Sequence, residues 1–144
     1  MSQHQINNIE GQSYDFNRVQ SLKLKNFRSY DNLDCTFKGC PVVLSGPNGS
    51  GKTNILEGLS LLSPGRGLRR APFEQFRNLK GPAEWGINAK VLSNNSSYKI
   101  STGISAGRIK GREVRINDKK VFASKSLPEI ISISWLPPSM DQIF

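Results

Sequence analysis

The sequence has almost none of the residues from which most catalytic and metal sites are built. Its 144 residues include one histidine, His4, and two cysteines, Cys35 and Cys40. A structural zinc site needs four ligands and a disulfide framework needs more cysteines, so we expect both cysteines to be reduced thiols. Acid–base catalysis by histidine also lacks a candidate, because His4 lies in a polar amino-terminal stretch.

Long apolar runs are also missing from the sequence. No window approaches the roughly 20 apolar residues that a membrane-spanning helix needs. The opening stretch, MSQHQINNIEGQSYDFN, lacks the apolar core of about 7–15 residues that secretory signals carry. We therefore expect no contact with a membrane and a cytoplasmic location, with residues 1–18 forming a flexible polar tail ahead of a domain over residues 19–144.

Acidic residues are few compared with basic ones. The chain has 11 Asp and Glu against 20 Lys and Arg, which gives a formal net charge of +9. Such a surplus favours polyanionic partners, and nucleic acid is the leading candidate. Charge alone does not exclude two alternatives, a basic protein that is merely soluble and one that is associated with ribosomes.

The sequence does contain a series of short strand-like runs. VQSLKLK at residues 19–25 and LDCTF at 33–37 alternate apolar and polar positions, as half-buried strands do. VVLS at 42–45 is a short apolar run, typical of a strand buried on both faces. From about residue 83 to 136, further β-like runs predict a meander of hairpins, with turns at SNNSS and IND.

The last predicted strand of this meander is EIISISWL, at residues 129–136. Its short apolar run is typical of a buried strand, and a pair of prolines would end it. Three aromatic residues, Trp85, Phe122 and Trp135, lie on the apolar phase of strand-like runs. We therefore expect them in the core, rather than as platforms on which bases stack.

The stretch LSGPNGSGKTNILEG places a glycine-rich loop between the strand at 42–45 and a predicted helix at 52–62. Four apolar residues at helical spacing indicate that helix and would share one face: Ile55, Leu56, Leu59 and Leu62. Residues 46–53, GPNGSGKT, fit the P-loop pattern of glycine, four residues, glycine, lysine and threonine. The chance of this pattern in a chain of this length is on the order of half a percent. The strand before it and the helix after it supply the context that the pattern requires.

Each residue type of the loop has a separate physical role. Glycine adopts backbone angles that other residues avoid and lets main-chain amides approach phosphate oxygens. The first amides of the helix and its dipole would attract the same anion. Lys52 would supply a positive charge to the β- and γ-phosphates, and Thr53 a hydroxyl ligand for Mg²⁺. The alternative is a glycine-rich turn with an incidental lysine.

The sequence therefore predicts a site for ATP and Mg²⁺. Its candidate nucleotide-binding residues are Gly46, Pro47, Asn48, Gly49, Ser50, Gly51, Lys52, Thr53 and Asn54, with Thr53 as the metal ligand.

Taken with the P-loop, three further stretches resemble the amino-terminal part of the RecF family of bacterial recombination mediator ATPases. These are NFRSY at residues 26–30, GRGLRRA at 65–71 and LPPSMDQIF at 136–144. The resemblance covers nearly all of residues 19–144. It implies an α/β P-loop NTPase fold, the first lobe of an ABC- or SMC-type ATPase head with an antiparallel β subdomain, here incomplete.

The resemblance also implies partners and a mechanism. In that family two protomers clamp ATP between the P-loop of one and the signature motif of the other, and the dimer closes on DNA. The implied partners are single-stranded or gapped double-stranded DNA, recombination mediator proteins and a second copy in an ATP-dependent homodimer. The implied roles are DNA replication, the repair of DNA damage by recombination, and the SOS response.

The chain departs from the family because the later Walker B and signature motifs are not found in it. Asp141 is a poor substitute for the Walker B carboxylate, since two prolines rather than Asp-Glu follow the last apolar run. Hydrolysis depends on that carboxylate to orient metal and water. We therefore expect ATP binding with little or no ATPase activity, and a chain that is a fragment, a truncated gene product or an expressed subdomain.

Several arginines are candidates for contacts with phosphate. The resemblance implies that Arg28 of NFRSY approaches the nucleotide, although a solvated loop arginine fits equally well. In GRGLRR, the residues Arg66, Arg69 and Arg70 are candidate DNA contacts, with a solvated helix end as the alternative.

A second group of basic residues lies on the predicted hairpins. It includes Arg112, a further candidate DNA contact, and it continues through Arg115, Lys119 and Lys120. These side chains could form a sequence-independent phosphate surface, or they could protect exposed sheet edges from aggregation.

Two functions from different classes remain at this point. The first is the ATP-binding lobe of a RecF-like DNA replication and repair protein, which binds DNA in an ATP-dependent manner. The alternative is a basic DNA-binding or interaction module that does not use nucleotide. Titration with an ATP analogue separates the two, because only the first function requires the P-loop lysine.

Overall fold

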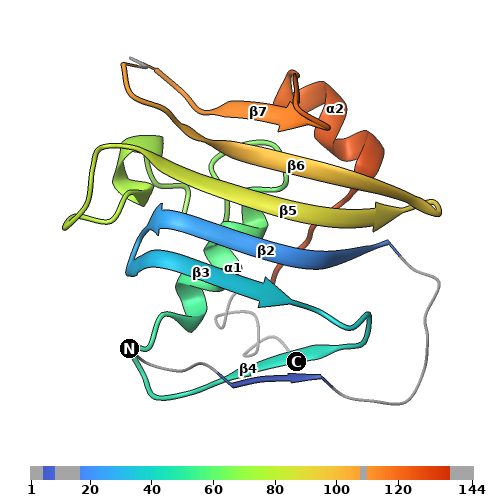
Figure 1. Ribbon diagram of the computed structural model, residues 1–144, viewed down its shortest axis with the longest axis horizontal. Helices are drawn as coiled ribbons and strands as arrows, with labels where there is room; N and C mark the ends of the chain where they lie inside the picture. The colour runs from blue at the N-terminus through green and yellow to red at the C-terminus, as the bar shows by residue number, and fades with distance from the viewer. Residues whose placement is uncertain (1–4, 9–16, 108–109, 137–144) are drawn as a thin grey trace.

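The computed structural model describes residues 5–8, 17–107 and 110–136 (Figure 1). In chain order its elements are β1 (Gln5–Asn8), β2 (Arg18–Phe27), β3 (Tyr30–Thr36), β4 (Val42–Ser45), α1 (Lys52–Ser60), the 3-10 helix η1 (Phe73–Phe76), β5 (Trp85–Ser93), β6 (Ser96–Ile104), β7 (Glu113–Ile116), β8 (Lys119–Lys120) and α2 (Ala123–Ile130). None of the helices in these residues has the length and apolar character needed to cross a membrane.

Six strands form an antiparallel sheet in the order β3-β2-β5-β6-β7-β8. The turns of the two later hairpins fall where the sequence predicts them, at Asn94 and Asn95 and at Asn117 and Asp118. All four residues have positive φ. Tight hairpin turns require that conformation at both central positions, and Asn and Asp tolerate it better than most residues.

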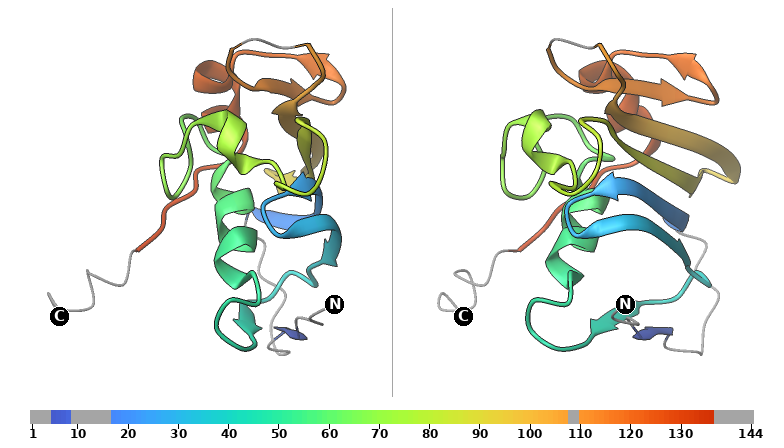
Figure 2. Two further views of the ribbon diagram at one scale, coloured as in Figure 1. Left: turned by 90° about the vertical axis from the view of Figure 1, so that its left-hand side faces the viewer. Right: turned by 60° about the vertical axis from the view of Figure 1, so that its left-hand side comes forward.

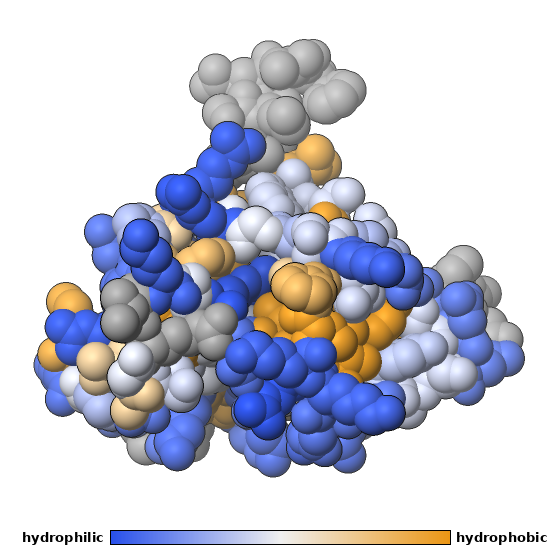
Figure 3. All heavy atoms as spheres, turned by 90° about the horizontal axis from the view of Figure 1, so that it is seen from above, coloured by the Kyte–Doolittle hydropathy of each residue, from blue (hydrophilic) through white to orange (hydrophobic). Residues whose placement is uncertain are grey.

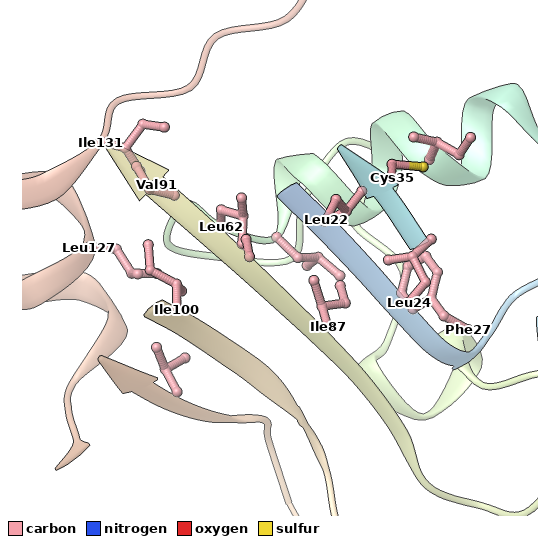
Figure 4. Packing of buried hydrophobic residues seen from close by; sticks show 14 of the residues in the cluster. Leu22, Leu24, Phe27, Cys35, Leu62, Ile87, Val91, Ile100, Leu127 and Ile131 are labelled. Atoms are coloured by element: carbon pink, nitrogen blue, oxygen red, sulfur yellow. The ribbon is translucent and has the colours of Figure 1, made fainter. Parts of the chain in front are cut away.

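The core lies between one face of the sheet and the helices. Strand residues alternate between the two faces, and the helices lie against one of them (Figure 2). In Figure 4, side chains from β2, β5 and β6 meet Leu62, which follows α1, and Leu127 of α2. The largest of the fully buried apolar side chains are Phe27, Phe76, Leu22, Leu24, Ile55, Leu61, Leu62, Ile87, Ile100, Leu127 and Val91.

An aromatic cluster joins η1 to the sheet. The ring centroids of Phe27 and Phe76 lie 5.7 Å apart, and Trp85 meets both rings edge-on. The indole of Trp85 donates a hydrogen bond to the carbonyl of Phe73 at 2.7 Å. The predicted core position of Trp85 is therefore confirmed.

Strand β4 leads into the glycine-rich loop but lies apart from the six-stranded sheet. Among the described residues it pairs only with β1, in a two-stranded antiparallel sheet (Figure 1). The predicted strand is confirmed, but its predicted burial on both faces is wrong, because one face is open and Val43 is 51% exposed. The pairing also means that Gln5–Asn8, within the polar tail expected over residues 1–18, form a strand.

The helix α1 leaves one apolar side open as well. Leu56, which the sequence places on the buried face, is 48% exposed, whereas Ile55 is fully buried. Leu56 borders a cavity of about 380 Å³ between β2, β4 and α1, which Leu44 and Leu59 also line. The helix thus packs on the sheet with one side and faces this cavity with another.

The carboxyl-terminal part of the described chain differs from the prediction. The expected strand at residues 129–136 is wrong, because Glu129 and Ile130 end the helix α2 and residues 131–136 form no strand. Leu127 and Ile130 are buried three positions apart, which is helical spacing.

Figure 3 shows an apolar area, bordered largely by hydrophilic side chains, on the side of the molecule that carries β7 and α2.

Two aromatic residues of this part are more exposed than the sequence predicts. Phe122 precedes α2 and is 82% exposed, while Trp135 is 40% exposed. The predicted core positions of both are wrong, because neither residue lies in a strand that packs on the helices.

Substitution by alanine should separate the buried from the exposed aromatic residues. We expect Trp85→Ala to lower the free energy of unfolding by about 3–5 kcal/mol, because it leaves a cavity beside the rings of Phe27 and Phe76. The control Phe122→Ala should change it by no more than about 0.5 kcal/mol. Urea denaturation measures both values, and equal losses would contradict the position of Phe122.

Candidate nucleotide-binding site

The glycine-rich loop runs from the end of β4 to the first residue of α1. Gly46, Gly49 and Gly51 have φ angles of 152°, 80° and 94°. L-residues with a Cβ rarely adopt these conformations, so glycine is the residue that the turn requires. The amide of Ser50 donates to the carbonyl of Pro47 at 3.2 Å, which closes a turn within the loop.

Two of these glycines have different surroundings. A Cβ at Gly51 would lie 2.5 Å from the hydroxyl oxygen of Tyr30, so the loop packs closely on the start of β3. A Cβ at Gly49 would meet no atom within 4 Å. Packing against Tyr30 therefore leaves no room for a side chain at Gly51, while Gly49 borders open space on the outer side of the loop.

The amino terminus of α1 is open to an anion. Gly51 is its N-cap and has no side chain with which to cap the helix, and the first turn contains no acidic residue. The first amides of a helix lack partners within the helix, and its dipole places a partial positive charge there. The arrangement has the features of a phosphate-binding turn.

Lys52 lies across the loop. Its ammonium group donates to the carbonyl oxygens of Gly46 at 2.6 Å and Pro47 at 2.7 Å, and it lies 3.4 Å from the hydroxyl of Ser50. Phosphate oxygens would offer the same ammonium group charged acceptors, which form stronger hydrogen bonds than neutral carbonyls do. The structure therefore places the charge of Lys52 at the loop, and its contact with phosphates stays a prediction.

In the part of the chain that the structure describes, no cluster of metal-binding side chains surrounds the loop. The described residues contain no group of three or more His, Cys, Asp and Glu side chains that could hold a metal ion. Thr53 is exposed in the first turn of α1, and its hydroxyl remains the candidate ligand. Mg²⁺ at nucleotide sites commonly takes one or two protein ligands together with phosphate oxygens and water, and this chemistry fits a hydroxyl beside a phosphate loop.

The second turn of α1 carries a fully buried carboxylate, Glu57. Arg28 donates to both of its oxygens, from Nε and from a terminal nitrogen, at 2.9 Å each. Arg69 lies 3.3 Å from one of these oxygens and 3.3 Å from the side-chain oxygen of Asn54. Asn54 in turn donates to the hydroxyl of Ser29 at 2.9 Å. These contacts join the β2–β3 turn, α1 and the connector after α1.

Arg28 is held from several directions. Its own φ is 53°, and its amide donates to the carbonyl of Phe76 at 2.7 Å. Its guanidinium also donates to the carbonyl of Gln75 at 3.0 Å and lies 4.9 Å from the ring centroid of Phe76. The structure thus brings Arg28 to the P-loop helix through Glu57.

Tyr30 ties the same turn directly to the loop. Its hydroxyl donates to the carbonyl of Gly51 at 3.1 Å. Burial, together with the nearby Cys35, raises the pKa of Tyr30 to about 12. The hydroxyl therefore keeps its proton at neutral pH and remains a donor.

The other arginine candidates separate into two groups. Arg66 and Arg70 are exposed on the connector after α1. Arg112 instead donates to the carbonyls of Leu61 and Ser63, the latter at 2.6 Å, at the end of the P-loop helix. Burial lowers the pKa of Arg112 to about 10. Its contacts favour a structural role over the DNA contact that the sequence suggests.

The sequence reasoning missed Glu57, Ser29 and Tyr30. A signal for Glu57 was present, because a single charge stands within the otherwise apolar run of the helix. A buried charge requires a partner of opposite sign, and Arg28 and Arg69 were both available. Nothing in the sequence indicated that Tyr30 would reach Gly51.

Comparison with known proteins shows the family to which the chain belongs. A family model described as an AAA domain matches residues 21–135. The chain is 41% identical over 127 residues to the DNA replication and repair protein RecF of Mesorhizobium japonicum, which is 88% of this chain and 34% of that protein. RecF of Rhizobium etli is 39% identical and RecF of Brucella abortus 40%, over the same 88% of this chain and 34% and 33% of those proteins. The chain spans about a third of the length of the curated relatives it matches.

Solved structures share the fold. A structure of the recombination mediator protein RecF with ATP superposes with a TM-score of 0.70 at 19% identity, over 94% of this chain and 36% of that one. An SMC ATPase structure gives 0.64 at 17% identity, over 78% and 76%. The predicted P-loop ATPase fold with an antiparallel sheet is thereby confirmed. The chain belongs to the AAA domain family, and the resemblance to the amino-terminal part of RecF that its motifs predict is confirmed over these 127 residues.

Proposed function

We propose that the chain binds ATP together with Mg²⁺ at residues 46–54. The observation that carries this proposal is the open amino terminus of α1, reached through three glycines with positive φ and faced by the ammonium group of Lys52. Backbone amides, a helix dipole and one mobile cation converge there, and this combination suits a chain of phosphates. Thr53 supplies the protein oxygen for the metal.

The chain acts, in this proposal, as the ATP-binding lobe of a RecF-like DNA replication and repair protein. Identity near 40% to RecF proteins over most of the chain supports this role. The protein would bind single-stranded or gapped DNA in an ATP-dependent manner, form an ATP-dependent homodimer and meet recombination mediator proteins. It would serve recombinational repair and the SOS response in the cytoplasm.

Hydrolysis by the chain itself should be slow. Hydrolysis needs a carboxylate that orients metal and water beside the γ-phosphate. Glu57 is the buried carboxylate of α1, and both of its oxygens already accept hydrogen bonds from Arg28. We therefore propose nucleotide binding without appreciable turnover for these residues.

A second candidate is a basic DNA-binding or interaction module that does not use nucleotide. The net charge of +9 favours it, because a basic surface attracts nucleic acid whether or not the loop is occupied. The two candidates differ in whether Lys52 of the P-loop is needed, because only the first candidate binds nucleotide.

Removal of the Lys52 ammonium group tests the proposal. We expect Lys52→Ala to weaken ATP binding by about 10–100-fold, since a hydrogen bond to a charged group contributes about 1.5–3 kcal/mol. Isothermal titration calorimetry with and without Mg²⁺ measures the affinity. Lys125→Ala, which changes an exposed helical lysine of α2, is the matched control and should bind as the parent does. Absence of ATP binding by the folded parent at millimolar nucleotide would overturn the proposal.

The two glycines of the loop should respond differently to alanine. Both substitutions carry a cost of about 1–2 kcal/mol for positive φ. Gly51→Ala should destabilise the fold further, because its Cβ would displace Tyr30. Gly49→Ala should keep most of the stability but lose ATP affinity, because its Cβ enters the space assigned to phosphate.

Urea denaturation and calorimetry on the same two proteins separate these effects. If Gly49→Ala binds ATP as tightly as the parent, the phosphates do not lie where we place them. If Gly51→Ala is the more stable of the two variants, the packing of Tyr30 against the loop is not a constraint on the fold.

A further inference from the structure

The outer face of the six-stranded sheet, opposite the core, is strongly polar. No described element covers this face, because the helices and the segment after α2 lie on the other side (Figure 2). The strand register gives the side chains on it. Across the sheet, one row contains Asp34, Lys23, Asn88, Ser101, Arg115 and Lys120, and a neighbouring row contains Ser21, Lys90 and Lys99.

Cations outnumber carboxylates on this face. Its six cationic side chains are Lys23, Lys25, Lys90, Lys99, Arg115 and Lys120, and all six are exposed. Three carboxylates lie beside them and form ion pairs with Lys23, Lys99, Arg115 and Lys120: Asp34, Asp118 and Glu113. The described residues show no ion pair for Lys25 or Lys90. The face therefore keeps a positive surplus.

Lys90 faces a second cation across the sheet, Lys99, whose charge Asp118 partly neutralises. Lys90 lies directly opposite Lys99 on the neighbouring strand. Like charges in directly opposed positions of an antiparallel pair are destabilising. An anion bound between β5 and β6 would relieve this repulsion. If residue 90 only had to be exposed to water, Ser or Thr would suit the strand equally well.

The face is also hollowed beside its cations. Gly86 and Gly103 are direct partners on β5 and β6, and a Cβ at Gly86 would meet no atom within 4 Å. The hollow has a volume of about 530 Å³, and its lining includes the cations Lys25 and Arg115, the hydroxyl of Ser101 and the carboxylates Glu84 and Glu113. At about 4.8 Å between strands, Lys25 and Arg115 lie on opposite sides of a depression roughly 14 Å wide.

We propose that this outer face binds the sugar–phosphate backbone of a nucleic acid. Lysine, arginine, serine and asparagine side chains are the groups that contact phosphate and sugar oxygens in such interfaces. The face carries no aromatic side chain in its register rows on which bases would stack, so recognition is through the backbone and without sequence preference. The inference rests on the proposed engagement of DNA and assigns a surface to it.

Lys25 and Lys90, for which the described residues show no ion pair, provide the test. In Lys25→Thr/Lys90→Thr both charges are removed, no carboxylate loses its partner, and threonine suits a strand. In the matched control, Lys38→Thr/Lys80→Thr, two exposed lysines outside the strands are changed. Both double variants lower the net charge by the same amount.

Binding of fluorescent 20-nucleotide single strands and 20-base-pair duplexes of random sequence is measured by anisotropy as salt is varied. We expect the face variant to bind at least about tenfold more weakly, and its dependence of log K on log salt to be shallower by about 2. The control should lose less than about threefold, because charges beyond a Debye length are screened. Equal loss in both variants, no loss in the face variant, or no DNA binding by the parent would overturn the inference.

Calorimetry with ATP on the same proteins keeps the two proposals apart. Unchanged ATP binding in the face variant, with weakened DNA binding, supports both. Unchanged ATP and DNA binding in that variant overturns the surface assignment and leaves the nucleotide proposal intact. If the parent does not bind ATP, but the face variant binds DNA more weakly than the control does, the nucleotide proposal alone is overturned.

Discussion

A buried charge on the P-loop helix is the constraint on which the arrangement of the site depends. Glu57 is fully buried, so its carboxylate needs cationic partners wherever the fold can supply them. Arg28 provides two hydrogen bonds from the β2–β3 turn, and Arg69 approaches from the connector after α1. Removing one partner of a buried pair typically costs about 3–5 kcal/mol, which is a large part of the stability of a small domain. Two segments, the β2–β3 turn and the connector after α1, are thereby fixed to the helix that starts at the phosphate loop.

Much of the fold could be predicted because its signals are local. The alternation of VQSLKLK, the asparagines of the two hairpin turns and the spacing of the P-loop each depend on neighbouring residues. The failures concern elements whose state is decided by tertiary packing. EIISISWL has the composition of a strand, but Ile130 completes a helix whose buried residues lie against the sheet, and Ser93 donates to its carbonyl at 2.5 Å. Short apolar runs cannot be assigned by periodicity alone.

The candidate site shows the same division. The glycine, lysine and threonine positions follow from the chemistry of phosphate binding and are legible in eight consecutive residues. The role of Arg28 was open in the sequence because its partner, Glu57, lies 29 residues away, and only the fold shows that the two meet. Arg112 looked like one of several surface cations, yet it is committed to carbonyls at the end of the P-loop helix. Contacts between distant segments leave no local signal.

Strand β2 connects the two surfaces for which we propose binding. Because side chains alternate along a strand, Lys23 and Lys25 face outward while Leu22 and Leu24 enter the core. Three residues after Lys25, the same chain segment reaches Arg28 and its carboxylate on α1. A phosphate at the loop would draw Lys52 away from Gly46 and Pro47, and the loop rests on Tyr30 at the start of β3. If nucleotide binding changed the conformation of the β2–β3 turn, the change would reach strand β2, which carries Lys23 and Lys25. Coupling of this kind requires two discrete arrangements of the turn. Arg28 has a positive φ that contacts on several sides maintain. Such a conformation identifies the turn as the element in which to look for the two arrangements.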